Sequence, residues 1–350
     1  MKIQAETLET WVAAIFAAAG CRPPENQRVA RHLVEANLVG HDSHGVIRVA
    51  TYVEWLREGK VFANKSMEVI SDTEVIAVVD GQFGMGQTIG EEVMELGIAK
   101  CSRHGLAVIA LRNCGHLGRI GDWALMAANA GLLSLHYVNT SGGGILVAPT
   151  GGTRRRLSAN PVAAGVPIQG GSPLILDIST CTIAEGKVRV ALNRGDRVPP
   201  GCLLDNQGRP TDDPRNFYTD PPGAILPLGG HKGFGLSVIV EMLAGALTGG
   251  SCSNPSVRRV ANNMLTILLS PAAFGTAEEF DQEARRFIAH VKDCPTVEPN
   301  GEILMPGEPE ERTKAQRLAE GVELDDTTWG QLRATCRQLG ISDAPIETLQ

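Results

Sequence analysis

The sequence is poor in aromatic residues and has no pattern typical of a metal site or a nucleic-acid-binding surface. Phe, Trp and Tyr together make up 4% of its 350 residues. The eight cysteines form no CxxC pair and no metal-ligand spacing, so no metal is expected. Basic residues are scattered apart from Arg154, Arg155 and Arg156, so no nucleic-acid partner is expected either. We interpret this triplet as a solvated turn, with a nucleotide-phosphate contact as the alternative.

From the sequence we also expect neither an export signal nor a membrane span. Glu6 and Glu9 interrupt the apolar stretch near the N-terminus. Residues 123–153 carry no charge except on His136 when it is protonated, but asparagines and a glycine run break them into helix, strand and loop. Several cysteines lie in apolar runs, as buried and reduced thiols do. We therefore expect a cytoplasmic protein without a membrane partner.

Neither standard nucleotide-binding fingerprint occurs. There is no GxxxxGK[ST] motif, which disfavours a P-loop NTPase. The nearest approach to the Rossmann pattern is residues 84–90, where the third glycine falls one position late. No acidic residue about 20 positions on ends a second strand, as that fingerprint requires. A Rossmann enzyme is therefore disfavoured.

The composition, 43% hydrophobic and 20% charged, is that of a globular protein, and it contains two kinds of periodicity. Apolar residues recur at helical spacing over residues 7–19, 25–39, 47–58 and from 308 onward. Between these ends, β-rich runs alternate with helical stretches. The expected strands are residues 75–79, 106–111, 132–138 and 264–269, and the expected helices are 87–104, 118–130 and 233–247. This alternation predicts an α/β protein with buried strands.

We divide the chain into three segments. Residues 1–65 form a helical N-terminal segment, residues 66–304 an α/β core that binds cofactor and substrate, and residues 305–350 a helical C-terminal segment. Both ends are amphipathic and each lacks a partner, so they are expected to pack together as one helical domain. The proline- and glycine-rich residues 197–230 are expected to form a long ordered loop.

Residues 40–48 hold the most informative side chains. His41, His44 and Arg48 fall within this one short segment. An imidazole transfers protons near neutral pH, and an arginine can hold a carboxylate with two hydrogen bonds. A helix from about His44 would place Arg48 one turn further on, facing the same pocket. The segment indicates a site for a small carboxylic acid, with a polar turn between two helices as the alternative.

A second histidine, His116, lies between Gly115 and Gly118, after the buried strand 106–111. Ligands of α/β proteins usually bind at the carboxyl ends of strands, so a functional role is favoured over a helix cap. Lys232 follows a glycine pair before an apolar helix, which suits a phosphate or merely a turn. Asp177 ends a strand, where it could accept a hydrogen bond from a ribose, orient a histidine or cap the next segment.

Taken in order, these segments resemble the malate/L-lactate dehydrogenase family, which also includes sulfolactate, ureidoglycolate and diketogulonate oxidoreductases. The matching residues run from about residue 30 to residue 310. They are Asp42-Ser43-His44-Gly45 with Arg48 and Tyr52, Gly115-His116-Leu117-Gly118, Asn160-Pro161, Leu176-Asp177 with Ser179-Thr180, Gly186-Lys187-Val188, Pro210-Thr211-Asp212-Asp213-Pro214, Gly230-His231-Lys232-Gly233-Phe234-Gly235 and Leu304-Met305-Pro306-Gly307-Glu308.

The resemblance implies a mixed-sheet, non-Rossmann fold that binds NAD or NADP, and a homodimer that interconverts a small 2-hydroxy acid and its 2-oxo acid by hydride transfer. It makes His44 and His116 the acid/base candidates, without a choice between them, and leaves His41 a structural role. Ser43, Arg48 and Asn160 are the implied substrate-binding residues, with Arg48 on the carboxylate. The implied cofactor-binding residues are Thr140, Asp177, Ile178, Ser179, His231, Lys232, Gly307 and Glu308.

Two other functions stay open at this point. A metal-dependent lyase or hydrolase of a small carboxylic acid could use His41, His44 and His116, although no HExxH or comparable spacing supports it. A fold that binds a nucleotide as a sensor, without turnover, is the other.

Two departures from the family pattern bear on specificity. Ser158-Ala159 stand where many members carry Gly-Thr, so a hydroxyl is missing, and Gly142-Gly143-Gly144 replace bulkier residues. Both changes are interpreted as widening the pocket or shifting its specificity.

Overall fold

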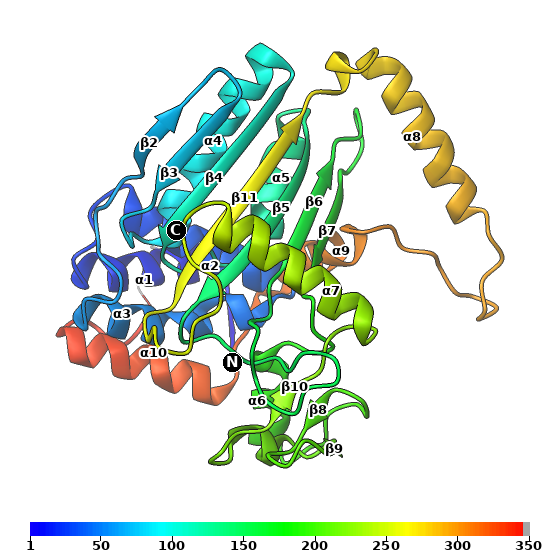
Figure 1. Ribbon diagram of the computed structural model, residues 1–350. Helices are drawn as coiled ribbons and strands as arrows, with labels where there is room; N and C mark the ends of the chain where they lie inside the picture. Colours follow the sequence, from blue (N-terminus) through cyan, green and yellow to red (C-terminus); the bar gives the residue numbers. More distant parts are fainter. Residues whose placement is uncertain (346–350) are drawn as a thin grey trace.

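The centre of the molecule is a seven-stranded mixed sheet (Figure 1). The computed structural model describes residues 1–345. The strand order is β2-β3-β4-β11-β5-β6-β7. The strands are β2 Glu68–Asp72, β3 Ile76–Asp80, β4 Leu106–Cys114, β5 Leu133–Ser141, β6 Val162–Val166, β7 Leu174–Ile178 and β11 Ala261–Leu269. β3 and β4 run parallel, whereas each other neighbouring pair in this sheet is antiparallel. The expected α/β class with a mixed sheet is confirmed.

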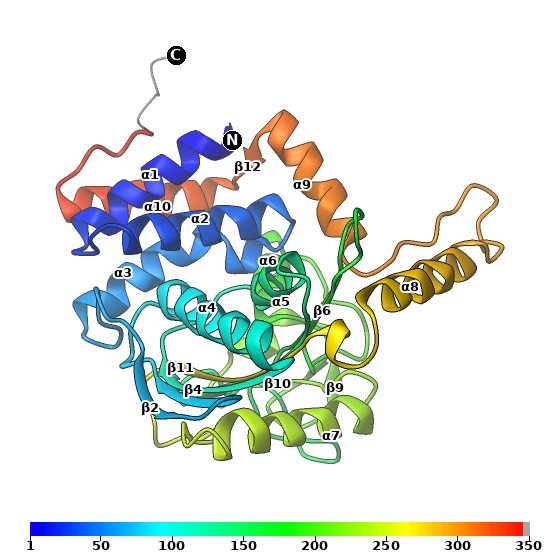
Figure 2. The same cartoon turned by 90° about the horizontal axis from the view of Figure 1, so that it is seen from above.

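Helices cover the two faces of the sheet in separate layers (Figure 2). α4 Gly86–His104 and α5 Gly121–Asn129 pack on one face. α7 His231–Val240 continues into a π-helical turn, η4 Glu241–Ala246, on the other. The main core lies between the sheet and α4 and α5, where Ile109, Trp123 and Met264 are fully buried. None of the helices in residues 1–345 is long and apolar enough to cross a membrane.

The two chain ends pack together in a further helical layer outside α4 and α5. It contains α1 Ala5–Ala18, α2 Glu25–Leu38, α3 Val49–Arg57 and α10 Asp326–Leu339. The rings of Trp11 and Trp329 have centroids 5.1 Å apart. The short strand β1 Lys2–Ile3 pairs with β12 Val322–Glu323. Burying the apolar faces of α1 and α10 against one another follows from their amphipathic pattern. The segment boundaries at residues 65 and 305 stay a prediction.

Residues 197–230 are not the loop that was expected. They contain β8 Leu203–Leu204, β9 Pro210–Thr211, β10 Ala224–Ile225 and the 3₁₀ turn η3 Pro214–Tyr218. The three strands form a small sheet, and its apolar residues share a core with Val188 of α6 Glu185–Arg194. Two-residue strands are too short to show an alternating pattern, which is why the sequence predicted a loop.

α8, Ala277–Lys292, stands away from the body of the molecule (Figures 1 and 2). Thr276 and Glu279 form a capping box that fixes where this helix begins. Phe280, Ala284 and Phe287 recur at helical spacing along one face, yet no side chain of the helix is buried. The helix therefore exposes an apolar face within the single chain.

Candidate active site

The turn that carries His44 is anchored by α2 and by α9, Glu308–Glu320. It forms two 3₁₀ turns, Asp42–His44 and Val46–Arg48, in place of the helix expected from His44. The Asn37 side chain donates to Asp42 Oδ1 (2.6 Å) and accepts from the Val46 amide (2.8 Å). Arg317 pairs with Asp42 at 2.6 Å. Gly45 is required, because a Cβ there would lie 2.2 Å from Asn37 Oδ1. The turn is thus fixed before any ligand binds.

His44 and His116 lie face to face although they come from different layers. His44 belongs to the turn after α2, and His116 follows β4 in the loop before α5. Their ring centroids are 5.6 Å apart, and the ring planes differ by 11°. Both side chains are half-buried. The structure therefore brings the two acid/base candidates into one site.

Each ring is held through its Nδ1 atom. Ser43 Oγ lies 3.0 Å from Nδ1 of His44, and the buried Tyr52 hydroxyl lies 2.5 Å from Nδ1 of His116. Burial raises the pKa of Tyr52 to about 12, so the phenol keeps its proton. Gln87 Nε2 donates to the phenol oxygen at 3.4 Å, and a second lone pair of that oxygen can accept from Nδ1–H of His116. In this tautomer Nε2 of neutral His116 carries no proton and can accept one.

The two imidazoles are neutral near pH 7. Burial lowers the pKa of His116 to about 3, and the positive charge of Arg48 acts in the same direction. Burial, followed by His116 and Arg48, holds the pKa of His44 well below its usual value. Neutral rings of this kind are ready to accept a proton.

Arg48 completes this group. Its Nε donates to the Ser43 carbonyl at 2.6 Å, which orients the guanidinium beside His44. It forms no ion pair with a carboxylate of residues 1–345, in contrast to Arg119 and Arg317. A guanidinium without an acidic partner is suited to bind a carboxylate ligand.

The end of β7 meets the start of α7. The Leu228 amide donates to the Thr180 carbonyl at 2.9 Å, which places Ser179 near the glycine loop before α7. His231 and Lys232 are the exposed first residues of α7. Asp177, Ile178 and Ser179 are half-buried, and Asp177 Oδ2 accepts from the Gly121 amide at 2.8 Å.

Gly307 and Glu308 lie beside β7. The Ile175 amide donates to the Pro306 carbonyl at 3.0 Å, and Gly307 has a φ of 99° at the start of α9. The Glu308 carboxylate pairs with Lys292 and accepts from the Met305 amide at 2.8 Å. The Glu308 oxygens are therefore already bonded within the chain, whereas the Gly307 backbone lies beside β7.

Asn160 and Thr140 join a buried polar network. Asn160 has no exposed surface, and its Nδ2 donates to Ser237 Oγ and Glu241 Oε1 at 2.9 Å each. Thr140 Oγ1 accepts from Asn262 at 2.9 Å. Glu241 comes from the π-helical turn η4. In this structure Asn160 therefore faces the protein interior.

The glycine run at 142–144 has a packing role. A Cβ at Gly142 would lie 2.2 Å from the Arg259 carbonyl, and one at Gly143 would lie 3.1 Å from the Arg258 carbonyl. The backbone of residues 257–259 thus occupies the space that side chains would need. At these two positions glycine allows two loops to pack closely, in place of the wider pocket expected from the sequence.

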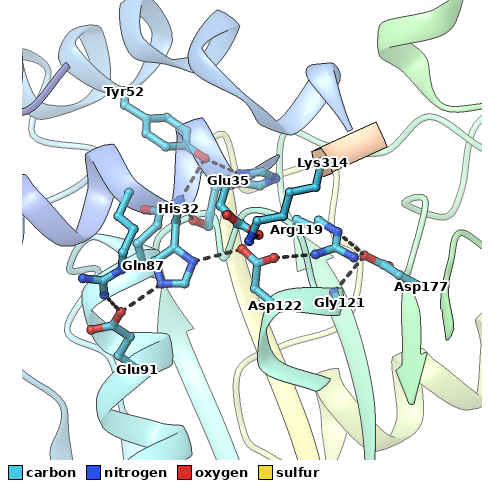
Figure 3. Close-up of polar contacts among 12 residues, drawn as sticks. His32, Glu35, Tyr52, Gln87, Glu91, Arg119, Gly121, Asp122, Asp177 and Lys314 are labelled. Carbon is cyan, nitrogen blue, oxygen red and sulfur yellow. Dashed lines mark hydrogen bonds and ion pairs between the residues drawn. The ribbon is translucent and has the colours of Figure 1, made fainter. Parts of the chain in front are cut away.

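A network of charged side chains next to Asp177 was missed by the sequence analysis (Figure 3). His32 lies 3.0 Å from Glu91 and 2.9 Å from Asp122. The second oxygen of Asp122 accepts from Arg119 Nη1 at 2.7 Å, and Arg119 Nε is 3.9 Å from Asp177. Its members are scattered over several elements and form no motif. The one available signal was the position of Arg119, just after the His116 motif.

The structure does not assemble the three histidines of the metal alternative into a metal site. His41 Nε2 is 3.2 Å from Glu310. Across residues 1–345, no group of three or more His, Cys, Asp or Glu side chains is arranged to hold a metal ion. The metal-dependent lyase or hydrolase therefore has no support.

Comparison with known protein sequences gives matches along almost the whole chain. The sequence model of malate/L-lactate dehydrogenases matches residues 3–333. Hydroxycarboxylate dehydrogenase B of Escherichia coli (strain K12) is 37% identical over 354 residues, with 100% of this chain and 96% of that protein covered. L-sulfolactate dehydrogenase of Methanocaldococcus jannaschii is 34% identical, with 91% and 92% covered.

Solved structures show the same fold. A malate/lactate dehydrogenase from E. coli superposes with a TM-score of 0.94 at 36% identity, covering 98% of this chain and 96% of the other. Sulfolactate dehydrogenase from M. jannaschii superposes with a TM-score of 0.86 at 32% identity, covering 98% of both chains. The sheet and the helical layer described above are thus shared over the full length.

Proposed function

Because the chain belongs to the malate/L-lactate dehydrogenase family and is an oxidoreductase of 2-hydroxy acids, we propose that His44, His116 and Arg48 perform its reaction. The observation that carries the proposal is the stacked pair of neutral imidazoles beside a guanidinium that has no acidic partner in the described chain. The reaction interconverts a 2-hydroxy acid and a 2-oxo acid. A dehydrogenase of this family works with a nicotinamide cofactor, either NAD or NADP.

Arg48 binds the substrate carboxylate. Two hydrogen bonds from the guanidinium fork fix the plane of that group, and so the direction of the adjacent C2 atom. Ser43 contributes by holding Arg48 through its carbonyl and His44 through its hydroxyl. Asn160, buried against Glu241, supports the site from within.

His116 moves the hydroxyl proton. When the hydroxy acid is oxidised, its neutral ring takes the proton from the C2 hydroxyl while the hydride leaves. When the oxo acid is reduced, the ring must be an imidazolium that donates to the developing alkoxide. Since the Arg48 charge lowers the pKa of His116, a carboxylate paired with Arg48 offsets that effect and raises the pKa. His44 orients the substrate from the opposite side of the pair.

The residues around β7 and α7 fit a nicotinamide dinucleotide. A Cβ at Gly230 would meet nothing within 4 Å, so the backbone at the start of α7 is open to a ligand. Exposed Lys232 and the open backbone at Gly230 would hold the diphosphate, and Asp177 and Ser179 would hydrogen-bond the remaining part of the dinucleotide. The other candidates are Thr140, Ile178, His231, Gly307 and Glu308. When bound, the cofactor donates or accepts the hydride.

The test is a spectrophotometric screen of the purified protein. NADH and NADPH are each mixed with a panel of 2-oxo acids that includes pyruvate, oxaloacetate and 3-sulfopyruvate. We expect the reduced-nicotinamide absorbance to fall with at least one acid. Cofactor binding without turnover on any acid would indicate a nucleotide-binding sensor and would contradict the proposal.

A second copy of the chain would cover α8, so we propose a homodimer. Phe287 of α8 is 53% exposed and Phe274, just before the helix, is 77% exposed. Such a projecting apolar face is typical of a subunit interface. Light scattering should give twice the chain mass, and Phe287→Asp should give the monomer. Gln282→Glu, on the same helix, is the control, and a monomeric unmodified protein would contradict the proposal.

The thiols support a cytoplasmic location. All eight cysteines are free, and Cys21, Cys101 and Cys114 are among those that are buried. Burial raises the pKa of these thiols, which keeps them unreactive. Reduced cysteines are the rule in reducing compartments.

A further inference from the structure

His32 is a charged histidine outside the stacked pair. Its side chain is 14% exposed, and its ring stacks at an angle against Trp123, with centroids 4.9 Å apart. Nε2 is 3.0 Å from a Glu91 oxygen, and Nδ1 is 2.9 Å from an Asp122 oxygen. Ionised carboxylates only accept hydrogen bonds, so both ring nitrogens must donate. Burial lowers the pKa of His32, but its bonds to Asp122 and Glu91 outweigh that effect and raise it to about 9.

The charges around His32 separate into two groups. Glu91, on α4, is also paired with Arg28 at 2.6 Å and with Arg31, so it has cations of its own on α2. Asp122, on α5, shares its oxygens between His32 and Arg119. This second group continues to Asp177 (Figure 3).

Two carboxylates and two cations make up the second group. The Arg119 side chain is 4% exposed, and its guanidinium is closer to Asp122 (2.7 Å) than to Asp177 (3.9 Å). With His32 charged, two cations balance Asp122 and Asp177. Without the His32 charge, the Arg119 guanidinium would be the one cation for both carboxylates, and it would lie closer to Asp122 than to Asp177.

Asp177 would then be the carboxylate with the weaker interaction with Arg119. Burial already raises its pKa, and the nearby charge of Arg119 works against that rise. If Asp122 takes a larger share of Arg119, Asp177 takes up a proton more readily. A protonated carboxyl accepts fewer hydrogen bonds from a ligand than a carboxylate does.

We propose that His32 is a positioning residue: its imidazolium completes the charge balance that keeps Asp177 ionised and Arg119 beside it for cofactor binding. His32 itself touches neither cofactor nor substrate. The inference rests on the proposed function, because Asp177 is one of the cofactor-binding residues proposed there.

Restoring the charge balance by a second substitution tests the inference. His32→Gln removes one cation, and His32→Gln combined with Asp122→Asn then removes one carboxylate. The dissociation constant of NADH and of NADPH is measured by fluorescence titration at pH 7. We expect about a 10-fold weaker complex for His32→Gln, equivalent to about 1.4 kcal/mol of binding free energy. The double variant should bind within about threefold of the unmodified protein.

Glu35→Gln is the matched control. Glu35 also lies on α2 and pairs with Lys314 at 2.6 Å, but it has no bond to Asp122 or Arg119. It should change the dissociation constant less than twofold. A merely structural role of His32 would make the double variant weaker than the single one, and that result would overturn the inference.

The pH dependence of cofactor binding distinguishes the role of His32 from the proposed function. As the pH falls from 8 to 5.5, Asp177 takes up a proton and binding should weaken in both proteins, but the loss should begin at a higher pH in His32→Gln, because removing the imidazolium raises the pKa of Asp177. Identical curves and constants for both proteins would overturn the role of His32 and leave the proposed function intact. No binding of either nucleotide by the unmodified protein would overturn both.

Discussion

His32 and the His44–His116 pair are half-buried imidazoles in neighbouring parts of one molecule, yet they have opposite charge states. His32 lies between two carboxylates, which raise its pKa to about 9. His116 faces a phenol, another imidazole and the cation Arg48, and its pKa falls to about 3. Burial penalises the charged form in both places. The difference therefore lies in the sign of the charges around each ring.

The comparison shows how one residue type serves two purposes. A histidine without acidic partners stays neutral and can exchange a proton with a ligand. A histidine between carboxylates holds its proton and acts as a fixed cation between helices. Neither role is visible from the exposed fraction alone.

The largest effect should come from removing the proton carrier itself. His116→Ala should lower kcat about 10³-fold, because no neutral base remains at the position of Nε2. His44→Ala, on the facing ring, should lower it only about 10-fold. Steady-state kinetics with the best substrate of the screen measures both. The reverse order of effects would assign proton transfer to His44.

Changing the cation beside the pair should sharpen the comparison. Arg48→Gln removes the charge that lowers the two pKa values and also the carboxylate fork. KM should rise about 50-fold, or about 2 kcal/mol, and the acid limb of kcat/KM should move to higher pH. Arg48→Lys keeps a positive charge, so it should raise KM while leaving the acid limb in place. A KM close to that of the unmodified enzyme in both variants would remove Arg48 from carboxylate binding.

His32 should make the free energy of unfolding depend on pH in the alkaline range. Its folded pKa of about 9 lies above the usual value of 6.5, so the stabilisation is complete below 6.5 and is lost as the pH rises through 9. The total is about 3 kcal/mol. Urea unfolding at pH 6.5 and 9.5 should show this loss in the unmodified protein, and His32→Gln should show less of it. Parallel losses in both proteins would mean that His32 is not the titrating group.

The smallest effect is expected at the phenol that holds His116. Tyr52→Phe keeps the ring but removes the hydroxyl that bonds Nδ1, so the imidazole can rotate and change tautomer. We expect kcat to fall about 10-fold with little change in KM. Val53→Ala, a truncation of the adjacent buried residue on α3, controls for destabilisation of the helix. A larger change in KM than in kcat would indicate that Tyr52 contacts substrate.

The sequence predicted the elements with a clear period and the residues that lie in motifs. The α/β class, the strands over 106–111 and 132–138, and the amphipathic ends follow from periodicity. His44, Arg48 and His116 were identified because glycines and neighbouring polar residues set them apart. The short strands at 203–204, 210–211 and 224–225 could not be predicted, since two residues show no alternating pattern and only their pairing with one another defines them as strands.

The charged network and the orientation of Asn160 could not be predicted from the sequence either. His32 lies in an ordinary amphipathic helical pattern, and nothing local shows that Glu91 and Asp122 will flank it. Asn160 matched a motif, but only the packing of η4 shows that its amide is bonded to Glu241. Interactions between residues far apart in the chain decide both cases.

The reacting histidines come from separate layers, and this has a consequence for how activity arises during folding. His44 and Arg48 belong to the helical layer formed by the chain ends, while His116 follows β4. Neither layer by itself contains both histidines, so the site forms only when the two layers pack together. Recovery of catalysis on refolding should therefore lag behind recovery of helical signal, because it records the moment when the two layers dock.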